Sequence, residues 1–338
     1  AQIVAGKNLS QDDAAAVFQQ IMSGEATPGQ IGALLTGLRV KGETAQEIAG
    51  AALTMRALST KVPAQSEGLV DTCGTGGSGS KLFNISTAAA FVAAAAGARV
   101  AKHGNRKMTS FSGSADVLEA AGVALALTPE QIATCIDEIG VGFMFAQAHH
   151  SAMRFAGPIR QEIGIRTLMN VLGPMTNPAG AKRQVIGVFS TDWQLQIAEV
   201  LKLLGSEHAL IVHSNGLDEI RLDAPTHVVE LKNGSIIQYD IAPSDFGIAP
   251  RSPQECAEIV ADSAATSLAL VKQSLADDNS TAADIVALNA GAAIYVSGVA
   301  RTLADGVAMA QDAISSGLAQ ERLAELVRIT SLMAESSS

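Results

Sequence analysis

The sequence is short of aromatic residues and of cysteine, and each shortage excludes a class of protein. Aromatic side chains make up only 4% of the 338 residues, so the core must be built mainly from alanine, leucine, isoleucine and valine, which is typical of α/β enzymes. The three cysteines, Cys73, Cys135 and Cys256, are odd in number and widely spaced. They predict neither a disulfide framework nor a cysteine metal site, and they favour a reducing cytoplasm.

Positive charge and long apolar runs are also scarce. Lysine and arginine number 23 against 33 acidic residues, and the resulting net charge of −10 argues against a protein that coats nucleic acid. The longest apolar run, around Ala88 to Ala98, falls short of the roughly 20 residues that span a bilayer, and no signal-peptide pattern is found. We therefore expect a cytoplasmic protein with no nucleic-acid partner and no membrane partner.

Helix start signals and a later strand–helix alternation predict two domains. Three helices with capping patterns, including the capping box Thr44 to Glu47, occupy the first 60 residues. From Leu69 onward, short apolar strands alternate with helices, which predicts a mainly parallel central sheet flanked by helices. We predict an α/β fold with a small all-helical domain over residues 1–65, joined by helices from about 160–178, and a large α/β domain over residues 69–338.

Individual elements follow from the same patterns. Helices are expected after Ile85 and after Ser114, and the turn Asn233-Gly234 predicts a hairpin. The expected strands are 69–72, 99–102, 141–145, 185–189, 209–212, 228–231 and 236–239, and further helices are expected over 129–139 and 193–204.

A glycine-rich loop follows the first strand. Four glycines fall within positions 74–79, and an alanine-rich helix comes next. Backbone N–H groups in such a loop can point at a phosphate, and the helix dipole adds to the attraction. The spacing of an ATP-binding P-loop is missing, and no acidic residue near position 99 supports a dinucleotide site. The loop predicts a phosphorylated ligand, the alternative being a glycine turn without a ligand.

Two further loops carry polar side chains after predicted strands. Lys102, Arg106 and Lys107 place three cations within six residues, and hydroxyls follow at positions 110–114. Because ligands of α/β sheets collect at the carboxyl ends of strands, we expect anion binding here rather than a solvated basic turn. Asp218 and Glu219 follow a later strand and suit Mg²⁺, although such pairs are also common in surface loops. The pair His149-His150 lacks the context of a zinc site.

Together, these segments resemble the anthranilate phosphoribosyltransferase family in order and spacing. The resemblance covers essentially the whole chain, and its motifs are specific as a set. The matching segments are Gly74–Gly77, Asn84–Thr87, Lys102–Arg106, Ser112–Asp116, Gly164–Thr167, Asn170–Pro178 and Gly216–Glu219. The resemblance implies transfer of the phosphoribosyl group of 5-phosphoribosyl 1-diphosphate to the amine of anthranilate in tryptophan biosynthesis. It also implies Mg²⁺ as cofactor and a homodimer formed through the helical domain.

The resemblance assigns roles to individual residues. The residues implied to hold 5-phosphoribosyl 1-diphosphate are Gly74, Gly77, Ser78, Asn84, Ser86, Thr87, Lys102, Asn105, Arg106, Lys107, Ser110 and Ser114. Those implied to meet anthranilate are Gly74, His103, Asn105, His150 and Arg160. Ser86, Asp218 and Glu219 are implied to hold Mg²⁺, directly or through water. No catalytic acid or base is expected, because an aromatic amine is already a neutral nucleophile.

The chain departs from the family pattern at three places. Ser78 stands where the family usually has aspartate, Leu82 where serine or threonine is frequent, and residues 107–109 are bulkier and more basic than usual. We expect these changes to alter the response to Mg²⁺ and the affinity for substrate rather than the reaction.

Two alternatives share this architecture. A pyrimidine nucleoside phosphorylase also acts at ribose C1, but its lysine loop continues with Ser-Thr-Gly-Gly rather than with the Gly104-Asn105-Arg106 found here. The second alternative is a non-catalytic relative that binds nucleic acid. The net negative charge of the chain and the intact Asp218-Glu219 pair argue against it.

Overall fold

One mixed sheet forms the centre of the protein. The computed structural model describes residues 2–65, 67–76, 81–106 and 111–336. Within these ranges the sheet has seven strands in the order β3-β2-β1-β4-β5-β6-β7. The strands are β1 (Leu69–Gly74), β2 (Arg99–Gly104), β3 (Val141–Phe145), β4 (Arg183–Gly187), β5 (His208–His213), β6 (Thr226–Lys232) and β7 (Ser235–Ile241).

The first five strands run parallel and the last two antiparallel, which confirms the predicted α/β class with its terminal hairpin. The fourth strand was predicted over 185–189 and instead spans Arg183–Gly187. Its pairing with β1 ends where Gly74 faces Gly187. Val188 still donates a backbone hydrogen bond to the Val212 carbonyl, and the half-buried Phe189 follows just beyond the end of β4, at the margin of the core.

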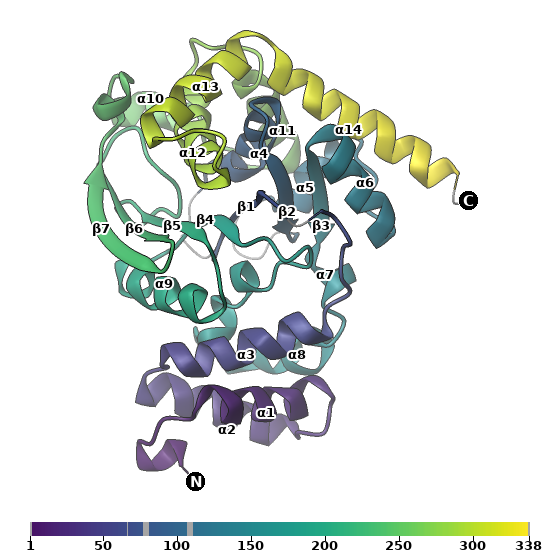
Figure 1. The fold of residues 1–338 in the computed structure, drawn as a ribbon, viewed down its shortest axis with the longest axis vertical. Coiled ribbons are helices and arrows are strands. Elements are labelled where there is room, and N and C mark those ends of the chain that lie inside the picture. The colour runs from purple at the N-terminus through teal and green to yellow at the C-terminus, as the bar shows by residue number, and fades with distance from the viewer. Residues whose placement is uncertain (1, 66, 77–80, 107–110, 337–338) are drawn as a thin grey trace.

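One face of the sheet, drawn above it in Figure 1, is covered by two helices from the first half of the chain and by helices from residues 264–335. Alanine-rich α4 packs there against α12, because small side chains allow the two helices to approach closely. Alternate strand residues such as Val70, Val185 and Leu210 point into this core. The helices of this layer are α4 (Ile85–Ala95), α5 (Ser114–Ala120), α11 (Ala264–Ser274), α12 (Thr281–Ser297), α13 (Leu303–Ser315) and α14 (Leu318–Glu335).

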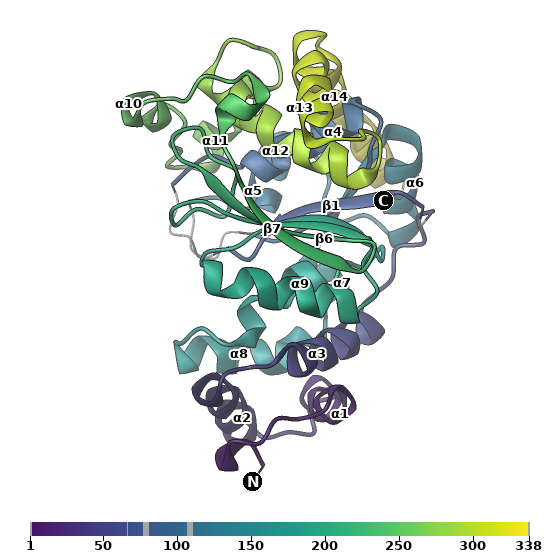
Figure 2. The same cartoon turned by 60° about the vertical axis from the view of Figure 1, so that its left-hand side comes forward.

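The opposite face is covered by α9, and below it lie the N-terminal helices (Figures 1 and 2). Ile186 and Ile211 point down into a second core that continues through α9 to Phe18 and Leu35 of the N-terminal helices. The helices on this side are α1 (Gln11–Met22), α2 (Pro28–Lys41), α3 (Ala45–Leu58), α8 (Met153–Ile163) and α9 (Gln194–Leu203), whereas α6 (Pro129–Ile139) lies at the β3 end of the sheet, against β3 and α14. The short elements are α7 (Ala146–His149), α10 (Pro253–Ala257), η1 (Ile3–Ala5), η2 (Leu168–Asn170), η3 (Gly173–Met175), η4 (Thr191–Trp193) and η5 (Pro243–Phe246).

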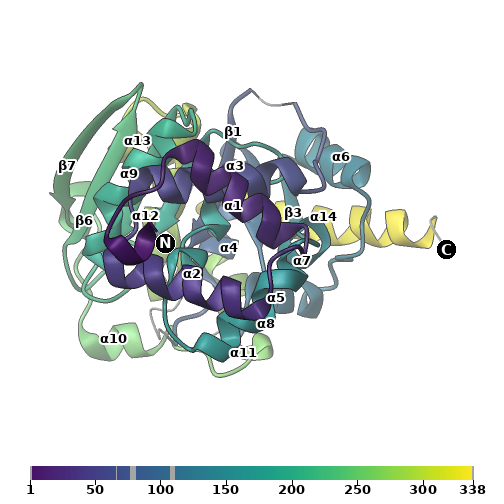
Figure 3. The ribbon, with the colours of Figure 1, turned by 90° about the horizontal axis from the view of Figure 1, so that it is seen from below.

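The helix α8 packs against α1 and α2, far from it in sequence. Figure 3, seen from below, shows these helices side by side with α3. The division at residues 1–65 and 69–338, with helices from about 160–178 joining the first part, stays a prediction; α8 belongs to the second part in sequence but packs against helices of the first. Across the described residues, none of the helices combines the length and apolar character needed to cross a bilayer.

The predicted caps are present. Thr44 accepts a hydrogen bond from the backbone N–H of Glu47, and the Glu47 carboxylate accepts one from the backbone N–H of Thr44. Thr128 and Gln131 form the same reciprocal pair at α6, which ends at Gly140 with a φ of 85°. These local signals explain why helix starts follow directly from the sequence.

Candidate active site

The carboxyl ends of β1, β2 and β4 meet at one edge of the sheet, where the strand order reverses direction on either side of β1. Such a switch point is where open α/β sheets bind ligands. A cavity of about 270 Å³ opens there. It is lined by Cys73, Gly74, Thr75, Gly76, Asn84, Ser86, Lys102, His103, Gly104, Asn105, Arg106, Ser112, Gly113, Ser114, Arg160, Arg166, Asn170 and Phe189.

Lys102 supplies a buried cation at the bottom of this cavity. Its side chain comes from the buried middle of β2 and is only 2% exposed. The ammonium donates to the Thr72 carbonyl oxygen at 2.5 Å and to the Ser86 hydroxyl at 3.3 Å. Burial lowers the pKa of Lys102, and the nearby carboxylate of Asp71 opposes that shift. An anion that enters the cavity would add a further favourable charge.

Asp71 holds the loop after β2 in place from within the sheet. Its carboxylate is fully buried and accepts hydrogen bonds from the backbone N–H of His103 at 3.1 Å and the Asn177 amide at 2.8 Å. The Asn177 amide also donates to the Ala101 carbonyl. Burial raises the pKa of Asp71, and the Lys102 charge counteracts that rise. The strands β1 and β2 and the segment before β4 are thus tied together beneath the cavity.

The rings of His103 and His150 are in contact, with their centroids 5.1 Å apart and their planes tilted by 58°. Burial, reinforced by the charge of the other histidine, lowers the pKa of His103 to about 3. Burial likewise lowers the pKa of His150 to about 4. Both rings are therefore neutral at pH 7. His103 reaches the cavity wall, whereas His150 lies behind it and is not among the cavity-lining residues.

Asp218 and Glu219 lie next to Ser86 around a smaller neighbouring cavity of about 20 Å³. Burial raises the pKa of Glu219 well above its ordinary value, and the adjacent Asp218 charge raises it further. Among the described residues, Glu219 Oε2 is buried without a hydrogen-bond partner. An unpaired oxygen, a second carboxylate and a hydroxyl form a donor set that fits Mg²⁺, which prefers oxygen ligands and keeps several waters.

Two glycines make room for this acidic pair. A Cβ atom on Gly74 would lie 2.7 Å from Asp218 Oδ2, and one on Gly187 would overlap with the Asp218 carbonyl oxygen. Glycine at both positions therefore lets the loop after β5 approach the ends of β1 and β4.

Asn84 joins three segments beside the cavity. Its Oδ1 accepts hydrogen bonds from the hydroxyls of Ser112 and Ser267, both at 2.7 Å. Ser114 begins α5 at the same wall. Thr87 is fully buried in the first turn of α4 and does not line the cavity.

The opposite wall comes from α8 and the segment after it. Arg160 and Asn170 line this wall, and Arg166 stacks on Phe189 at 4.0 Å. Burial lowers the pKa of Arg160. Its guanidinium has no hydrogen-bond or ion-pair partner in the part of the chain that the structure describes, so it is available to a carboxylate in the cavity.

Most of the predicted site residues therefore meet. Those that line the two cavities are Gly74, Asn84, Ser86, Lys102, His103, Asn105, Arg106, Ser114, Arg160, Asp218 and Glu219. Arg106 lines the wall, but its guanidinium is engaged by Asp116 at 3.2 Å and Glu119 at 2.7 Å. Gly77, Ser78, Lys107 and Ser110 lie outside the described residues.

Sequence reasoning missed Gly187, Arg166 and Phe189 as site residues. The motif around Arg166 was noticed, but no pattern in the sequence alone indicated that it returns to the strand ends. Phe189 was placed inside a strand. Its position just after a strand that parallels β1 was the available signal, because residues at that point share the ligand-binding edge.

Comparison with known proteins gives consistent results along the whole chain. Residues 1–59 match the family described as "Glycosyl transferase family, helical bundle domain", and residues 66–320 match "Glycosyl transferase family, a/b domain". The chain is 56% identical to anthranilate phosphoribosyltransferase from Marinomonas sp. over 333 residues, which covers 98% of this chain and 95% of that protein. It is 54% identical to the enzyme of the same name from Teredinibacter turnerae, with 98% of each chain covered.

Solved structures agree. The crystal structure of anthranilate phosphoribosyltransferase from Thermus thermophilus is 41% identical and superposes with a TM-score of 0.92, covering 97% of this chain and 98% of that one. The Saccharomyces cerevisiae enzyme in complex with PRPP and Mg is 25% identical with a TM-score of 0.84, covering 96% and 94%. This protein belongs to the anthranilate phosphoribosyltransferase family.

Proposed function

We propose that the cavity at the strand ends is where this enzyme transfers the phosphoribosyl group of 5-phosphoribosyl 1-diphosphate to the amine of anthranilate. The products are N-(5-phosphoribosyl)anthranilate and pyrophosphate. The observation that supports this site most strongly is the meeting of a buried cation, Lys102, with the Asp218-Glu219 pair, opposite the Arg160 guanidinium, which has no partner among the described residues. This arrangement offers a cation and a metal site to a sugar diphosphate and a guanidinium to an aromatic carboxylate.

The phosphoribosyl side is formed by the ends of β1 and β2. Lys102 compensates negative charge, while Asn84, Ser86 and Ser114 offer hydrogen-bonding groups near helix starts. Gly74 leaves backbone groups accessible to a ligand. The further assignments to Gly77, Ser78, Thr87, Arg106, Lys107 and Ser110 remain predictions from the family resemblance.

Ser86, Asp218 and Glu219 would hold Mg²⁺ in the neighbouring cavity. When bound, Mg²⁺ supplies neutralisation of the charge that develops on the departing pyrophosphate. The yeast enzyme, which was solved with PRPP and Mg, supports the use of Mg²⁺. The protein's own residues contribute by fixing the acidic pair at the strand ends, through the close approach of Gly74 and Gly187.

The anthranilate side is formed by Arg160 with Asn105 and His103, and His150 supports the His103 ring. A guanidinium paired with the anthranilate carboxylate would orient the amine toward ribose C1. Because the amine is neutral, orientation and electrostatic stabilisation of the leaving group replace general-base catalysis. The neutral state of His103, whose pKa is lowered to about 3, adds no positive charge beside the amine.

We further propose a cytoplasmic homodimer formed through the helical domain at residues 1–65, with the α/β domain at 69–338. The family resemblance supports this assembly. Size-exclusion chromatography with light scattering tests it: a mass near 69 kDa, twice the 34.6 kDa of the chain, is expected, and a mass near 34.6 kDa would contradict it.

The reaction is tested by following anthranilate fluorescence. The purified enzyme with 5-phosphoribosyl 1-diphosphate and Mg²⁺ should remove the fluorescence and release pyrophosphate. The matched reaction contains uridine or thymidine and inorganic phosphate, and it should release no free base. Phosphorolysis of the nucleoside without loss of anthranilate would favour the nucleoside phosphorylase instead.

A further inference from the structure

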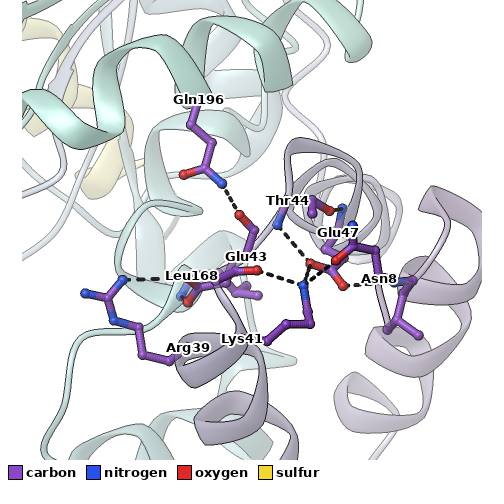
Figure 4. A network of polar contacts seen from close by, with 10 residues as sticks. Asn8, Arg39, Lys41, Glu43, Thr44, Glu47, Leu168 and Gln196 are labelled. Atoms are coloured by element: carbon purple, nitrogen blue, oxygen red, sulfur yellow. Dashed lines mark hydrogen bonds and ion pairs between the residues drawn. The ribbon is translucent and has the colours of Figure 1, made fainter. Parts of the chain in front are cut away.

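A corner between α2 and α3 contains two neighbouring buried glutamates that face different parts of the molecule (Figure 4). Glu47 is completely buried and binds within the helical layer, where it accepts from Lys41 at 3.0 Å and from the backbone N–H of Leu9 at 2.9 Å. Glu43 is 8% exposed and reaches out of that layer. Glu47 therefore stabilises the corner itself, whereas Glu43 is free to make a contact outside the corner.

The Glu43 carboxylate contacts the segment that forms the anthranilate wall. Its Oε1 accepts a hydrogen bond from the backbone N–H of Leu168 at 3.1 Å, although 125 residues separate the two in sequence. Leu168 begins the short helix η2, and it is flanked by the wall residues Arg166 and Asn170. Because the Leu168 N–H is fully buried, losing its acceptor would require this turn to move.

A second series of contacts leads from the α2–α3 corner to Arg166. Arg39, paired with Glu43 at 3.6 Å, lies over the Trp193 ring at 6.0 Å. Trp193 meets Phe189 edge to face at 6.3 Å, and Arg166 lies over Phe189 at 4.0 Å. The backbone and the side chain of the Arg166 region are thus both fixed from the α2–α3 corner.

We propose that Glu43 is a positioning residue for the anthranilate wall of the cavity, acting through the turn at Leu168 and the position of Arg166. The inference rests on the proposed placement of anthranilate beside Arg160. It predicts that disturbing Glu43 changes anthranilate binding selectively, because the phosphoribosyl side is built from β1, β2 and the loop after β5, which Glu43 does not contact.

The experiment measures KM for each substrate in variants of the full enzyme. Glu43→Ala should raise KM for anthranilate about tenfold and leave KM for 5-phosphoribosyl 1-diphosphate within twofold. Glu43→Gln keeps an oxygen acceptor for Leu168 and should stay within threefold of wild type for both. Glu47→Gln, the matched control in the same corner, should lower the melting temperature and leave both KM values within twofold. If Glu43→Ala does not fold, Glu43→Asp, whose carboxylate is withdrawn by one methylene, is measured instead.

Arg160→Gln separates failure of this inference from failure of the proposed site. If Arg160→Gln raises KM for anthranilate but Glu43→Ala does not, or if Glu43→Ala raises both KM values equally, the positioning role is overturned. If Arg160→Gln leaves KM for anthranilate unchanged, the placement of anthranilate itself is wrong, and the inference falls with it.

Discussion

Gly187 lies so close to the backbone of Asp218 that no side chain fits between them. A Cβ atom at Gly187 would overlap with the Asp218 carbonyl oxygen, and the Asp218 Cβ would lie 2.9 Å away. Gly187 ends β4 opposite Gly74 of β1, so this contact fixes where the acidic loop meets the sheet. The position of Asp218 and Glu219 therefore depends on the absence of one methyl group.

Gly187→Ala should displace the acidic pair, because a backbone atom cannot yield as a flexible side chain can. We expect kcat/KM for 5-phosphoribosyl 1-diphosphate to fall at least about 100-fold, the scale expected when groups that stabilise developing charge are misplaced. Steady-state kinetics over a range of Mg²⁺ concentrations measures the effect.

The control is Gly29→Ala, in the first turn of α2, where a Cβ would meet nothing within 4 Å. That variant should retain full activity. Wild-type kinetics in Gly187→Ala would show that the loop after β5 tolerates displacement, contrary to this account.

Lys102→Met should weaken binding of the diphosphate substrate. A charge-assisted hydrogen bond contributes about 1.5–3 kcal/mol, which corresponds to a rise in KM of about 10- to 150-fold. Lys102→Arg should not restore affinity, because the contacts to the Thr72 carbonyl and the Ser86 hydroxyl suit one compact ammonium rather than a planar guanidinium. Isothermal titration with 5-phosphoribosyl 1-diphosphate measures the affinity directly.

Lys182→Met serves as the charge control, since Lys182 is an exposed lysine paired with Glu207. Unchanged affinity in Lys102→Met, or an equal loss in both variants, would argue against a specific role for the buried cation.

The buried pair His103 and His150 should make the protein sensitive to acid. Their pKa values in the folded state, about 3 and about 4, lie below the ordinary value of 6.5. Between pH 6.5 and these lower pKa values, the two histidines bind protons in the unfolded chain but not in the folded protein. The free energy of unfolding therefore falls as pH drops below about 6.5, by up to about 1.4 kcal/mol per pH unit for each histidine.

His150→Asn removes one of these groups and should flatten the dependence of unfolding free energy on pH between about 6.5 and 4.5. Comparison with the parent also cancels the opposite contribution of Asp71 and Glu219, whose raised pKa values stabilise the fold as pH falls. Urea unfolding at several pH values measures the slope. His227→Gln is the control, because the His227 ring on β6 is partly exposed. An equal flattening of the pH dependence of the unfolding free energy in both variants would refute the assignment to the buried pair.

Much of the fold follows from local signals in the sequence. The α6 helix and strand β3 have the predicted bounds, because Thr128 caps the helix and Gly140 separates it from the strand. The register of β4 could not be predicted in the same way. Val188 and Phe189 continue an apolar pattern, so the pattern does not mark the end of β4 at Gly187, where the Asp218 loop approaches the strand.

The candidate site divides in the same manner. Residues on the loops after β1, β2 and β5 could be predicted, because the carboxyl ends of parallel strands meet at one edge. Arg166 and the contact of Glu43 with Leu168 could not, since they depend on how α8 and the α2–α3 corner pack beside the sheet. The engagement of Arg106 by Glu119 was likewise invisible in a run of basic residues.

The most direct test of the account is the rate of anthranilate consumption against Mg²⁺ concentration for wild type and for Asp218→Asn/Glu219→Gln. Burial and the adjacent Asp218 charge both raise the pKa of Glu219, and the double variant removes the buried charge and the repulsion, so its melting temperature should not fall. We predict no wild-type activity in excess EDTA, saturation with added Mg²⁺, and less than about 1% of that rate in the variant at every concentration. Superimposable curves for the two proteins would contradict a metal-assisted transfer at this edge of the sheet.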